Sequence, residues 1–382
     1  MRRWLWLFVF LWLLAVPYNS IYAYPGGDED ENCEALREAA IEALEAGIQV
    51  EEPDCVSDPG RSAIELRAAY GEMAEPSFTE IRQLPINEEI LYQRRYIRIV
   101  GDAQFYDAPH GNVVGSISRG YNFASYRLIN AEGWVQLTNN QWVPPEFVQE
   151  ADVSSFTGIE ILQPLTHSYA WMIRTARPSR YPGGPEDREQ APIRQYTLLT
   201  IYATEFVDGW EWYMVGPEQW LQQTRVAKLK PVQRPAEIGP NDYWIAVDLF
   251  EQTAVAYEGD RMVFATLISS GLPQWSTNEG LFKVYIRATS TPMTGASGQP
   301  SYYFIENVPW VMYFDGDIAL HGAYWHDLFG YRQSKGCVNL SILDAWWLYR
   351  WSEGAVDKSP YVYVYSSGEY RDDLPAWARR PR

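Results

Sequence analysis

Cysteine, histidine and basic residues are all scarce in this sequence. Its 382 residues include three cysteines and four histidines. The cysteines lie far apart and no Cys/His cluster has the spacing of zinc ligands, so we predict neither a metal site nor a cofactor. Lys and Arg number 31 against 49 Asp and Glu, which gives a net charge of −18. This acidity argues against nucleic-acid binding, which requires a basic stripe.

Long apolar runs are absent beyond the first residues. A basic tip precedes a thirteen-residue apolar run, Trp4–Val16, which is short for a membrane span and typical of a signal peptide. We expect residues 1–23 to be a signal peptide that is cleaved after Ala23. The alternative is an uncleaved membrane anchor. Both predict export of the rest of the chain, and no later segment is long enough for a second span.

An acidic segment follows at residues 24–90. It holds eighteen Asp and Glu against four Arg, so it carries 4 − 18 = −14 of the net charge. Apolar residues recur at helical spacing between Cys33 and Cys55, and a second helical stretch covers about 62–70. A disulfide between Cys33 and Cys55 would tie together two short helices that have little core of their own. Residues 76–90 are typical of a linker.

The last third of the chain, residues 239–366, has the pattern of a β-rich domain. Short runs of apolar and β-branched residues, separated by turns, predict strands at 244–248, 253–257, 262–268, 280–286, 302–304, 310–314, 318–321 and 361–365. A single helix is expected after Ser341, a suitable N-cap, with Asp344 completing an approximate capping box. Its apolar side would consist of Trp346, Trp347, Leu348 and Trp351. We therefore predict a mainly β fold: a β-sandwich with one helix.

Two residues of this domain have the chemistry of a nucleophile and its base. Cys337 lies just before the predicted helix, whose positive dipole end would favour the thiolate. His321 ends the apolar run that starts at Ile318, so a strand-end histidine and a helix-start cysteine can meet in space. Gly336 permits close backbone approach, so its N–H and that of Cys337 could bind one oxyanion. If Cys33 and Cys55 pair, Cys337 is the remaining free thiol.

The segment from His321 to Asn339 resembles the active-site signature of bacterial L,D-transpeptidase catalytic domains. His-Gly, an aromatic pair, Ser-x-Gly-Cys and the trailing Asn occur in the family's order and at suitable spacing. The resemblance implies that His321 is the general base, oriented by the backbone carbonyl of Gly322, and that Cys337 is the nucleophile. One position departs from the family, which usually has Ser-His-Gly-Cys: Lys335 replaces the second histidine.

Four further residues are candidates for binding the substrate: Ser334, Lys335, Asn339 and Tyr324. Each of the first three has an alternative. Ser334 could support the loop beside the thiol, Asn339 could cap the local turn, and Lys335 could be a solvated charge or contact a carboxylate of the donor peptide. Of the other histidines, His326 is expected to hold loop structure through Asp327, and His110 and His167 to be surface or turn residues.

The resemblance implies an exported, cell-wall enzyme of peptidoglycan biogenesis and cell shape. Its partners would be peptidoglycan stem peptides, and carbapenems could acylate it. Cys337 would form a thioester with release of a terminal D-alanine and transfer the acyl group to an amine of a neighbouring stem. The acceptor could instead be water, giving an L,D-carboxypeptidase, or a protein amine, giving anchoring. Because of Lys335, an inactive domain that only binds wall peptide is a further alternative, and a purely structural surface protein is another.

One or two small β-barrels are expected before the catalytic domain. Residues 91–151 have predicted strands at 96–100, 113–117, 134–137 and 141–143, and resemble a bacterial SH3-like domain. Residues 212–221 repeat the Trp-turn-Gln-Trp-apolar pattern of 134–143, so 152–238 is predicted as a second copy with an inserted surface loop at 177–192. Such modules either bind wall glycan or peptide, or support the catalytic domain.

Two further segments complete the expected organisation. The Gly-, Ser- and Pro-rich loop at 289–300 is either a lid over the site or an ordinary surface hairpin. Residues 367–382 are expected to be a C-terminal tail.

Overall fold

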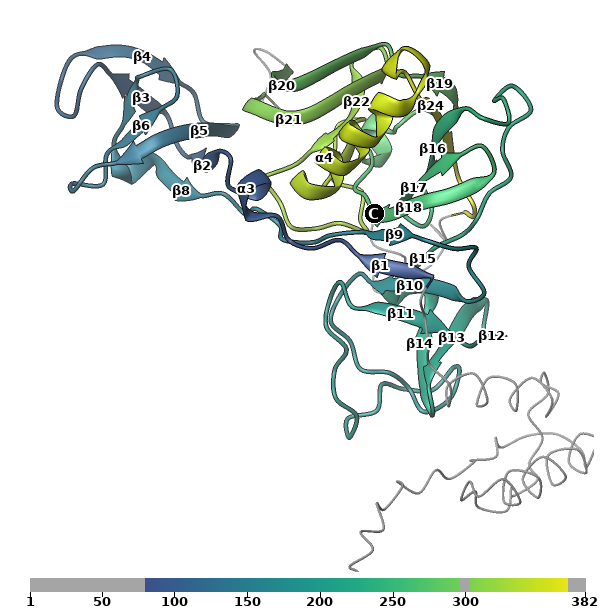
Figure 1. Ribbon diagram of the computed structural model, residues 1–382. Coiled ribbons are helices and arrows are strands. Elements are labelled where there is room, and N and C mark those ends of the chain that lie inside the picture. The colour runs from purple at the N-terminus through teal and green to yellow at the C-terminus, as the bar shows by residue number, and fades with distance from the viewer. Residues whose placement is uncertain (1–79, 296–301, 370–382) are drawn as a thin grey trace, which may run out of the picture. The chain divides into compact units, whose positions relative to one another are not determined.

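The computed structural model describes residues 80–295 and 302–369 (Figure 1). The predicted signal peptide, the two acidic helices and the Cys33–Cys55 disulfide lie outside the described residues, as does most of the predicted tail. Strands dominate the described part, and α4, Ile342–Trp351, is its one helix of more than a single α-turn. The predicted mainly β fold, with one helix after the cysteine, is confirmed.

The predicted catalytic region, residues 239–366, contributes strands to two sheets. One sheet has the order β1-β9-β18-β17-β16-β24-β19, in which β16 and β24 are parallel. Its strands are β1 (Ile81–Gln83), β9 (Ile159–Ile161), β16 (Tyr243–Asp248), β17 (Thr253–Glu258), β18 (Arg261–Leu267), β19 (Gly280–Lys283) and β24 (Tyr361–Tyr365). The other contains β20 (Ile286–Gly295), β21 (Tyr303–Asp315), β22 (Ile318–Gly322) and β23 (Val338–Leu340). Short 3-10 turns occur at Pro273–Trp275, Ser352–Gly354 and Val356–Lys358.

The two sheets and α4 share one apolar core. It contains buried residues of the first sheet, of β21 to β23 and of the helix, among them Ile245, Val362, Met312, Leu320, Val338 and Leu348. Alternate residues of each strand point into this core, because side chains in a strand alternate between its faces. The predicted β-sandwich is therefore present, with α4 packed as its helical element.

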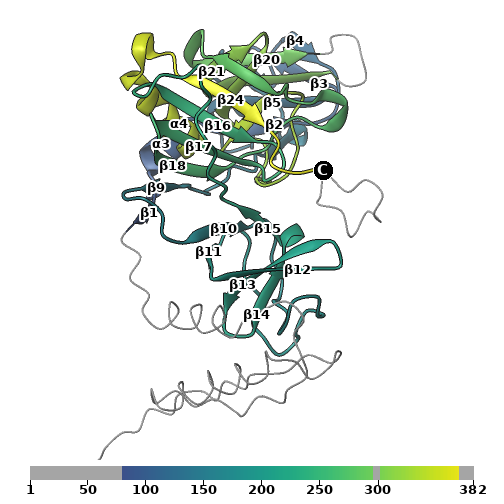
Figure 2. The ribbon, with the colours of Figure 1, turned by 90° about the vertical axis from the view of Figure 1, so that its right-hand side faces the viewer.

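The predicted strand pattern is correct in most places and wrong between 280 and 314. Strand 280–286 divides into β19 and β20, while 302–304 and 310–314 are parts of the single long strand β21. Residues 289–295, expected in a loop, belong to β20, which pairs antiparallel with β21. Figures 1 and 2 show these two strands side by side. The polar composition of 289–295 hid the strand because much of it is only partly buried.

The first module, residues 91–151, is an antiparallel sheet with the strand order β8-β2-β5-β6-β7-β3-β4. Its elements are β2 (Arg95–Ile99), β3 (Ala103–Tyr106), β4 (Val113–Ile117), β5 (Tyr121–Ile129), β6 (Val135–Leu137), β7 (Trp142–Val143), a 3-10 turn at Pro145–Phe147 and β8 (Val148–Glu150). Ile97, Ala124 and Val135 belong to its own small core. Its SH3-like character stays a prediction.

The second module, residues 152–238, contains two three-stranded sheets (Figure 2). They are β11-β10-β15 and β12-β13-β14, formed by β10 (Ser168–Met172), β11 (Leu198–Ile201), β12 (Ala203–Val207), β13 (Trp210–Gly216), β14 (Gln219–Gln222), a 3-10 turn at Gln223–Arg225 and β15 (Val226–Lys228). The repeated pattern corresponds to strand pairs β6–β7 and β13–β14. The inserted loop is tied at its base by a bridge between Ala176 and Ile193 and internally by an Arg180–Asp187 ion pair.

The predicted linker at 76–90 is wrong for its described part. β1 pairs with β9, and β9 pairs with β18, so segments on either side of the first module extend the catalytic sheet. Helix α3 (Glu88–Leu91) follows β1, with Asn87 as its N-cap. Two prolines suggested an irregular connection, but the run Ile81–Gln83 has a sheet edge available to it, which local sequence does not reveal.

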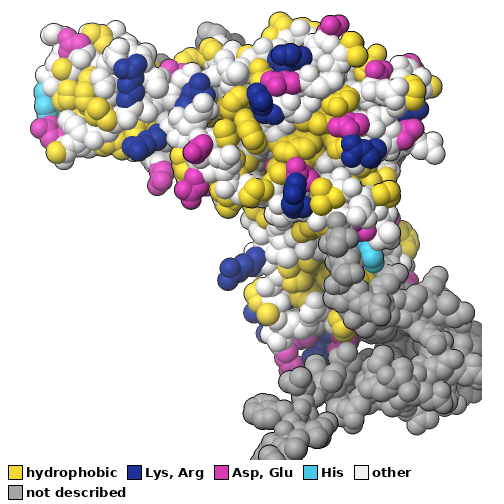
Figure 3. Space-filling model, in the orientation of Figure 1, with side chains coloured by type: hydrophobic (Ala, Val, Ile, Leu, Met, Phe, Trp, Pro, Cys, Tyr) yellow, Lys and Arg dark blue, Asp and Glu magenta, His cyan; other side chains and the backbone are white. Residues whose placement is uncertain are grey.

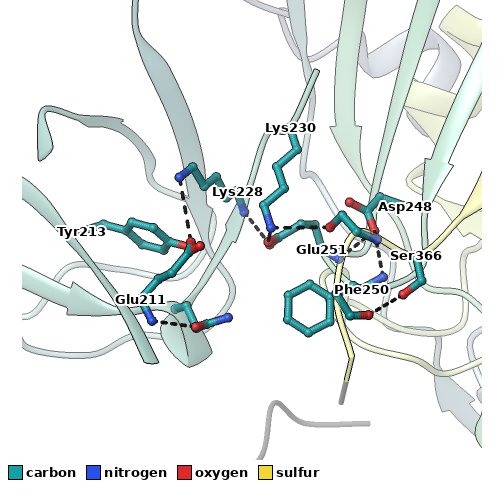
Figure 4. A network of polar contacts seen from close by, with 11 residues as sticks. Glu211, Tyr213, Lys228, Lys230, Asp248, Phe250, Glu251 and Ser366 are labelled. Atoms are coloured by element: carbon teal, nitrogen blue, oxygen red, sulfur yellow. Dashed lines mark hydrogen bonds and ion pairs between the residues drawn. The ribbon is translucent and has the colours of Figure 1, made fainter. Parts of the chain in front are cut away.

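A polar network joins the second module to the catalytic sheet (Figure 4). Glu251, 2% exposed, accepts a hydrogen bond from Lys228 N and lies 2.9 Å from Lys230 Nζ. Asp248 accepts from the N–H groups of Phe250 and Ser367. A buried carboxylate without such partners would be strongly destabilising, so the contacts of Glu251 with Lys228 and Lys230 couple the two regions.

Two surface features bear on the earlier expectations. On the face drawn in Figure 3, Lys and Arg side chains are scattered among Asp and Glu and form no continuous stripe. No helix within 80–295 and 302–369 has the length and apolar character of a membrane-spanning helix.

Candidate active site

Cys337 directly precedes a strand, not a helix. Val338–Leu340 form β23, and only then does Ser341 begin α4 by accepting a hydrogen bond from Asp344 N at 3.1 Å. The predicted N-cap is confirmed, but the placement of the thiol at the helix start is wrong. The helix buries Ile342, Leu343, Ala345 and Leu348, whereas the three tryptophans expected on its apolar side are only partly buried.

The pairing of β22 with β23 sets the positions of the two predicted catalytic residues. The strands are parallel, with Leu320 opposite Val338 and His321 opposite Asn339. Leu320 and Val338 point into the core beneath the sheet. The alternation of side chains then places His321, in β22, and Cys337, the residue just before β23, together on the other face of the sheet. Cys337 accordingly packs against a separate apolar cluster on that face, which contains Ala319.

His321 is buried and neutral in the resting protein. Burial lowers its pKa to about 4, against a smaller opposing effect of its contact with the Gly322 carbonyl. Nδ1 lies 3.2 Å from that carbonyl oxygen, which can only accept. Nδ1 therefore carries the proton and Nε2 has the free lone pair that a base needs. The structure thus contains the carbonyl contact that the resemblance implied.

The thiol of Cys337 is partly exposed and unpaired. Burial of the sulfur raises the pKa of the thiol to about 11, a hydrogen bond from the Ala319 backbone opposes this shift, and the charge of Asp317 adds to it. Its sulfur lies 3.7 Å from the carbonyl oxygen of Asp317. The expected helix-dipole stabilisation of a thiolate is therefore wrong, because β23 separates the thiol from the helix.

The loop before Cys337 is closed by Ser334. The Ser334 hydroxyl donates to the carbonyl of Cys337 and accepts from Gly336 N at 3.1 Å. The Gly336 carbonyl in turn accepts from Thr277 Oγ1 at 2.7 Å. Gly336 has a φ of +119°, which a glycine adopts without strain. In this structure the Gly336 N–H is thus engaged, which contradicts its predicted role as an oxyanion donor, and Ser334, 8% exposed, supports the loop rather than presenting itself to a substrate.

Lys335 lies on two aromatic rings. Its Nζ is 4.4 Å from the ring centroid of Tyr303 and 5.1 Å from that of Trp275. Both distances are within the range of cation–π attraction. The ammonium group therefore lies beside the thiol loop on an exposed residue, and both alternatives, a solvated charge and a contact to a donor carboxylate, stay predictions.

Two tyrosines near the thiol were missed from the sequence. The Tyr303 and Tyr313 hydroxyls have pKa values raised by burial and, next, by the charge that Cys337 would carry as a thiolate. Tyr313 pairs with Ala319, so it shares the sheet face of His321. The tight turn alone would pair Tyr313 with Leu320, and a bulge between Tyr313 and Asp315 shifts it to Ala319, so the sequence around the turn gave no signal for this position.

Tyr324, Asn339 and His326 are buried supports. Tyr324 is fully buried, stacks on Tyr96 with ring centroids 3.6 Å apart, and donates to the Glu306 carbonyl. Asn339 is 2% exposed, with its side-chain amide 2.9 Å from His326 Nε2. The structure therefore does not present either candidate to a substrate.

The expectations for the remaining histidines are partly correct. His326 does structure its loop, but through Leu328 N and the amide of Asn339 rather than through Asp327. His110 is exposed and lies 2.6 Å from Glu132. His167 contacts Thr166 Oγ1 at 2.8 Å. Within the described ranges, no three His, Cys, Asp or Glu side chains gather as a metal site would need.

The comparisons with known proteins agree on one part of the chain. Residues 242–368 match the YkuD family model, the L,D-transpeptidase catalytic domain. This region is about a third of the chain. No curated protein matches the chain.

Among solved structures, this catalytic domain is similar to L,D-transpeptidases. The Enterococcus faecium protein is 25% identical over 34% of this chain and 50% of its own, with a TM-score of 0.29. The Stackebrandtia nassauensis protein is 24% identical, and the match covers 35% of this chain and 60% of that protein, with a TM-score of 0.27. L,D-transpeptidase 3 of Mycobacterium tuberculosis, solved with a faropenem-derived adduct, is 19% identical. The match covers 45% of this chain and 71% of that protein, with a TM-score of 0.29. The chain thus spans only half to three-fifths of the first two.

Proposed function

We propose that this protein is an exported L,D-transpeptidase that forms peptidoglycan cross-links through a thioester on Cys337. The observation that carries the proposal is the parallel β22–β23 pair, which puts the His321 and Cys337 side chains on one sheet face. The match of residues 242–368 to the L,D-transpeptidase catalytic domain supports the reaction class. Export rests on the apolar run near the N-terminus and places the enzyme at the cell wall.

Acylation begins with both groups neutral. The Cys337 proton moves to Nε2 of His321 as the sulfur attacks a stem-peptide carbonyl carbon. Because Gly336 N–H is engaged by Ser334, the backbone N–H of Cys337 is the remaining predicted donor for the oxyanion. The carbon–nitrogen bond then breaks, the leaving amine takes the proton from His321, and a terminal D-alanine departs from the thioester.

Transfer runs through the same groups in reverse. An amine of a neighbouring stem attacks the thioester carbonyl, and His321 accepts its proton. The carbon–sulfur bond breaks and Cys337 regains a proton from His321. No nucleotide is consumed, because cleavage of the first amide supplies the acyl group. Water or a protein amine in the acceptor position gives the carboxypeptidase and anchoring reactions.

Intact-protein mass after exposure to a carbapenem tests the proposal. Wild type gains the mass of the carbapenem, C337A gains nothing, and H321A gains it far more slowly at neutral pH. An adduct retained in C337A would refute the role of this sulfur. Product analysis with a tetrapeptide donor, with and without an amine acceptor, then separates transpeptidation from hydrolysis.

A catalytically inactive, wall-binding domain is the second candidate. Two observations favour it: Lys335 occupies the position of a family histidine, and burial raises the pKa of the Cys337 thiol to about 11. A folded wild type that takes up no carbapenem and still co-sediments with purified peptidoglycan would establish this candidate. Carbapenem adduct formation would exclude it.

A further inference from the structure

The hairpin formed by β20 and β21 has a break in the middle. Thr291 pairs with Val308 and Met293 with Ile305, so Pro292 faces two residues, Glu306 and Asn307. A proline cannot donate to the ladder, and the extra residue leaves the bulged strand without its regular bonds there. Asn307 has a φ of +52°, a conformation that costs free energy unless its surroundings stabilise it. The outer half of the hairpin, residues 293–295 and 303–305, is therefore joined to the inner half at this point by a long hydrogen bond, 3.4 Å from Ser290 Oγ to Asn307 Oδ1, in place of regular ladder bonds.

The first module supplies bonds at this break. The carboxylate of Glu306 accepts from Ser125 N at 3.1 Å, from Ser125 Oγ at 3.3 Å and from Thr138 Oγ1 at 3.3 Å. Asn307 Nδ2 donates to Ser125 Oγ at 2.5 Å. Ser125 is fully buried and Glu306 half-buried, so these bonds are shielded from water. Both bulge residues are therefore fastened to the first module.

The backbone of the outer half is paired to the same module. Tyr303, Phe304 and Ile305 pair in parallel with Tyr121, Asn122 and Phe123 of β5. On its other edge the same segment pairs with β20, through Gly295 and Thr294 among others. Residues 303–305 are thus an inner strand between β20 and β5, and β5 fixes their position independently of the broken hairpin.

The outer half reaches the thiol. The ring of Tyr303 lies 4.4 Å below Lys335 Nζ, and a charge on Cys337 raises the pKa of the Tyr303 hydroxyl after the larger effect of burial. A displacement of residues 303–305 therefore moves Tyr303 relative to the Lys335–Cys337 loop. Small misplacements of groups that line a reacting centre have large effects on rate.

We propose that the first module is a positioning element of the active site, which holds the outer half of the β20–β21 hairpin in place through Glu306 and Ser125. The inference rests on the proposed function for its catalytic consequence. Glu306 is a positioning residue, because it touches neither Cys337 nor His321. The module's role is then to place Tyr303 beside the thiol loop and so to shape the part of the site that meets the acylating molecule.

The first test measures the joint itself in the full chain. Hydrogen–deuterium exchange of the 303–305 amides reports whether the segment is still paired with β5. Glu306→Ala removes all three acceptor contacts, and we expect protection there to fall about tenfold, the effect of roughly 1.4 kcal/mol. Glu146→Ala removes an exposed glutamate of the same module and leaves these amides unchanged. Unchanged protection in E306A would overturn the proposal, whatever the enzyme's activity.

The second test follows acylation by a carbapenem and separates its binding constant KI from its rate constant kinact. We expect E306A to raise KI about tenfold, while alkylation of Cys337 by iodoacetamide, a far smaller reagent, stays within about twofold of wild type. S125A removes the hydroxyl but keeps the Ser125 N–H bond to Glu306, so we expect it to raise KI less than E306A does. The effect of the double variant E306A/S125A should fall short of the sum of the two single effects, because the two side chains share one contact.

The outcomes are distinguishable from failure of the proposed function. No acylation of wild type refutes the transpeptidase reaction and leaves the exchange measurement to decide on the joint. Normal acylation of E306A, or fully additive effects of E306A and S125A, refutes the positioning role alone. If E306A does not fold, S125A gives the same exchange readout with a smaller change.

Discussion

The resting thiol of Cys337 should be protonated at neutral pH. Burial raises its pKa to about 11, two units above the ordinary value of 9.0, which corresponds to about 2.7 kcal/mol against the thiolate. At pH 7 only about one molecule in ten thousand carries the thiolate, about a hundredfold fewer than for an ordinary cysteine. His321, with a pKa lowered to about 4, is also neutral. The pair therefore begins as thiol and imidazole, not as an ion pair.

The rate of alkylation by iodoacetamide measures this directly. We expect the rate at Cys337, followed on its own tryptic peptide so that Cys33 and Cys55 do not contribute, to rise about tenfold per pH unit from 7 to 10. Asp317→Asn should raise the rate at pH 8 severalfold, because the Asp317 charge contributes to the shift. A rate that is already level between pH 6 and 8 would show a preformed thiolate–imidazolium pair and refute the reasoning.

Three further predictions concern the supports of the site. Burial raises the pKa of Asp344 to about 7, so the protein is most stable when Asp344 is protonated and loses stability as pH rises from about 4 to 7. Relative to D344N, the wild-type free energy of urea unfolding should drop by roughly 2.7 kcal/mol between pH 5 and 8. An unchanged difference between the two proteins would contradict this prediction. S334A should lower the free energy of unfolding, measured by thermal denaturation, by about 1–3 kcal/mol, because the Gly336 N–H loses its acceptor. G158A should lower the free energy of urea unfolding by about 1–3 kcal/mol or more, because the new Cβ would lie 2.4 Å from a backbone oxygen of β18. Wild-type stability of this variant would refute the close contact.

Local sequence predicted elements whose signals are short-range. Alternating apolar residues located β16, β17 and β24 almost to the residue, and Ser341 with Asp344 located the start of α4. The same reasoning missed β20 and β23. In β20 the half-exposed surface is polar, and β23 has only three residues between Cys337 and the helix cap. Short strands depend on a neighbour for their bonds, so their own residues carry little signal.

The role assignments divide in a similar way. Residues chosen for their chemistry, Cys337 and His321, are brought to one sheet face, and their catalytic roles stay predictions. Residues chosen from their place in the motif fared worse, since Tyr324 and Asn339 are buried and the Gly336 N–H is already bonded. A motif identifies which residue types lie close to a reactive group. It does not state which of their donors are taken by other parts of the fold.

The sequence by itself determined the helix cap and the alternating strands and predicted the nucleophile–base pair, because each depends on residue chemistry or on neighbours within one turn or strand. Only the tertiary structure decided the rest: the parallel β22–β23 register, the approach of Tyr303 and Tyr313 to the thiol, and the attachment of the β20–β21 hairpin to the first module. These features join segments up to 182 residues apart, and their positions follow from packing and paired hydrogen bonds that no local pattern encodes.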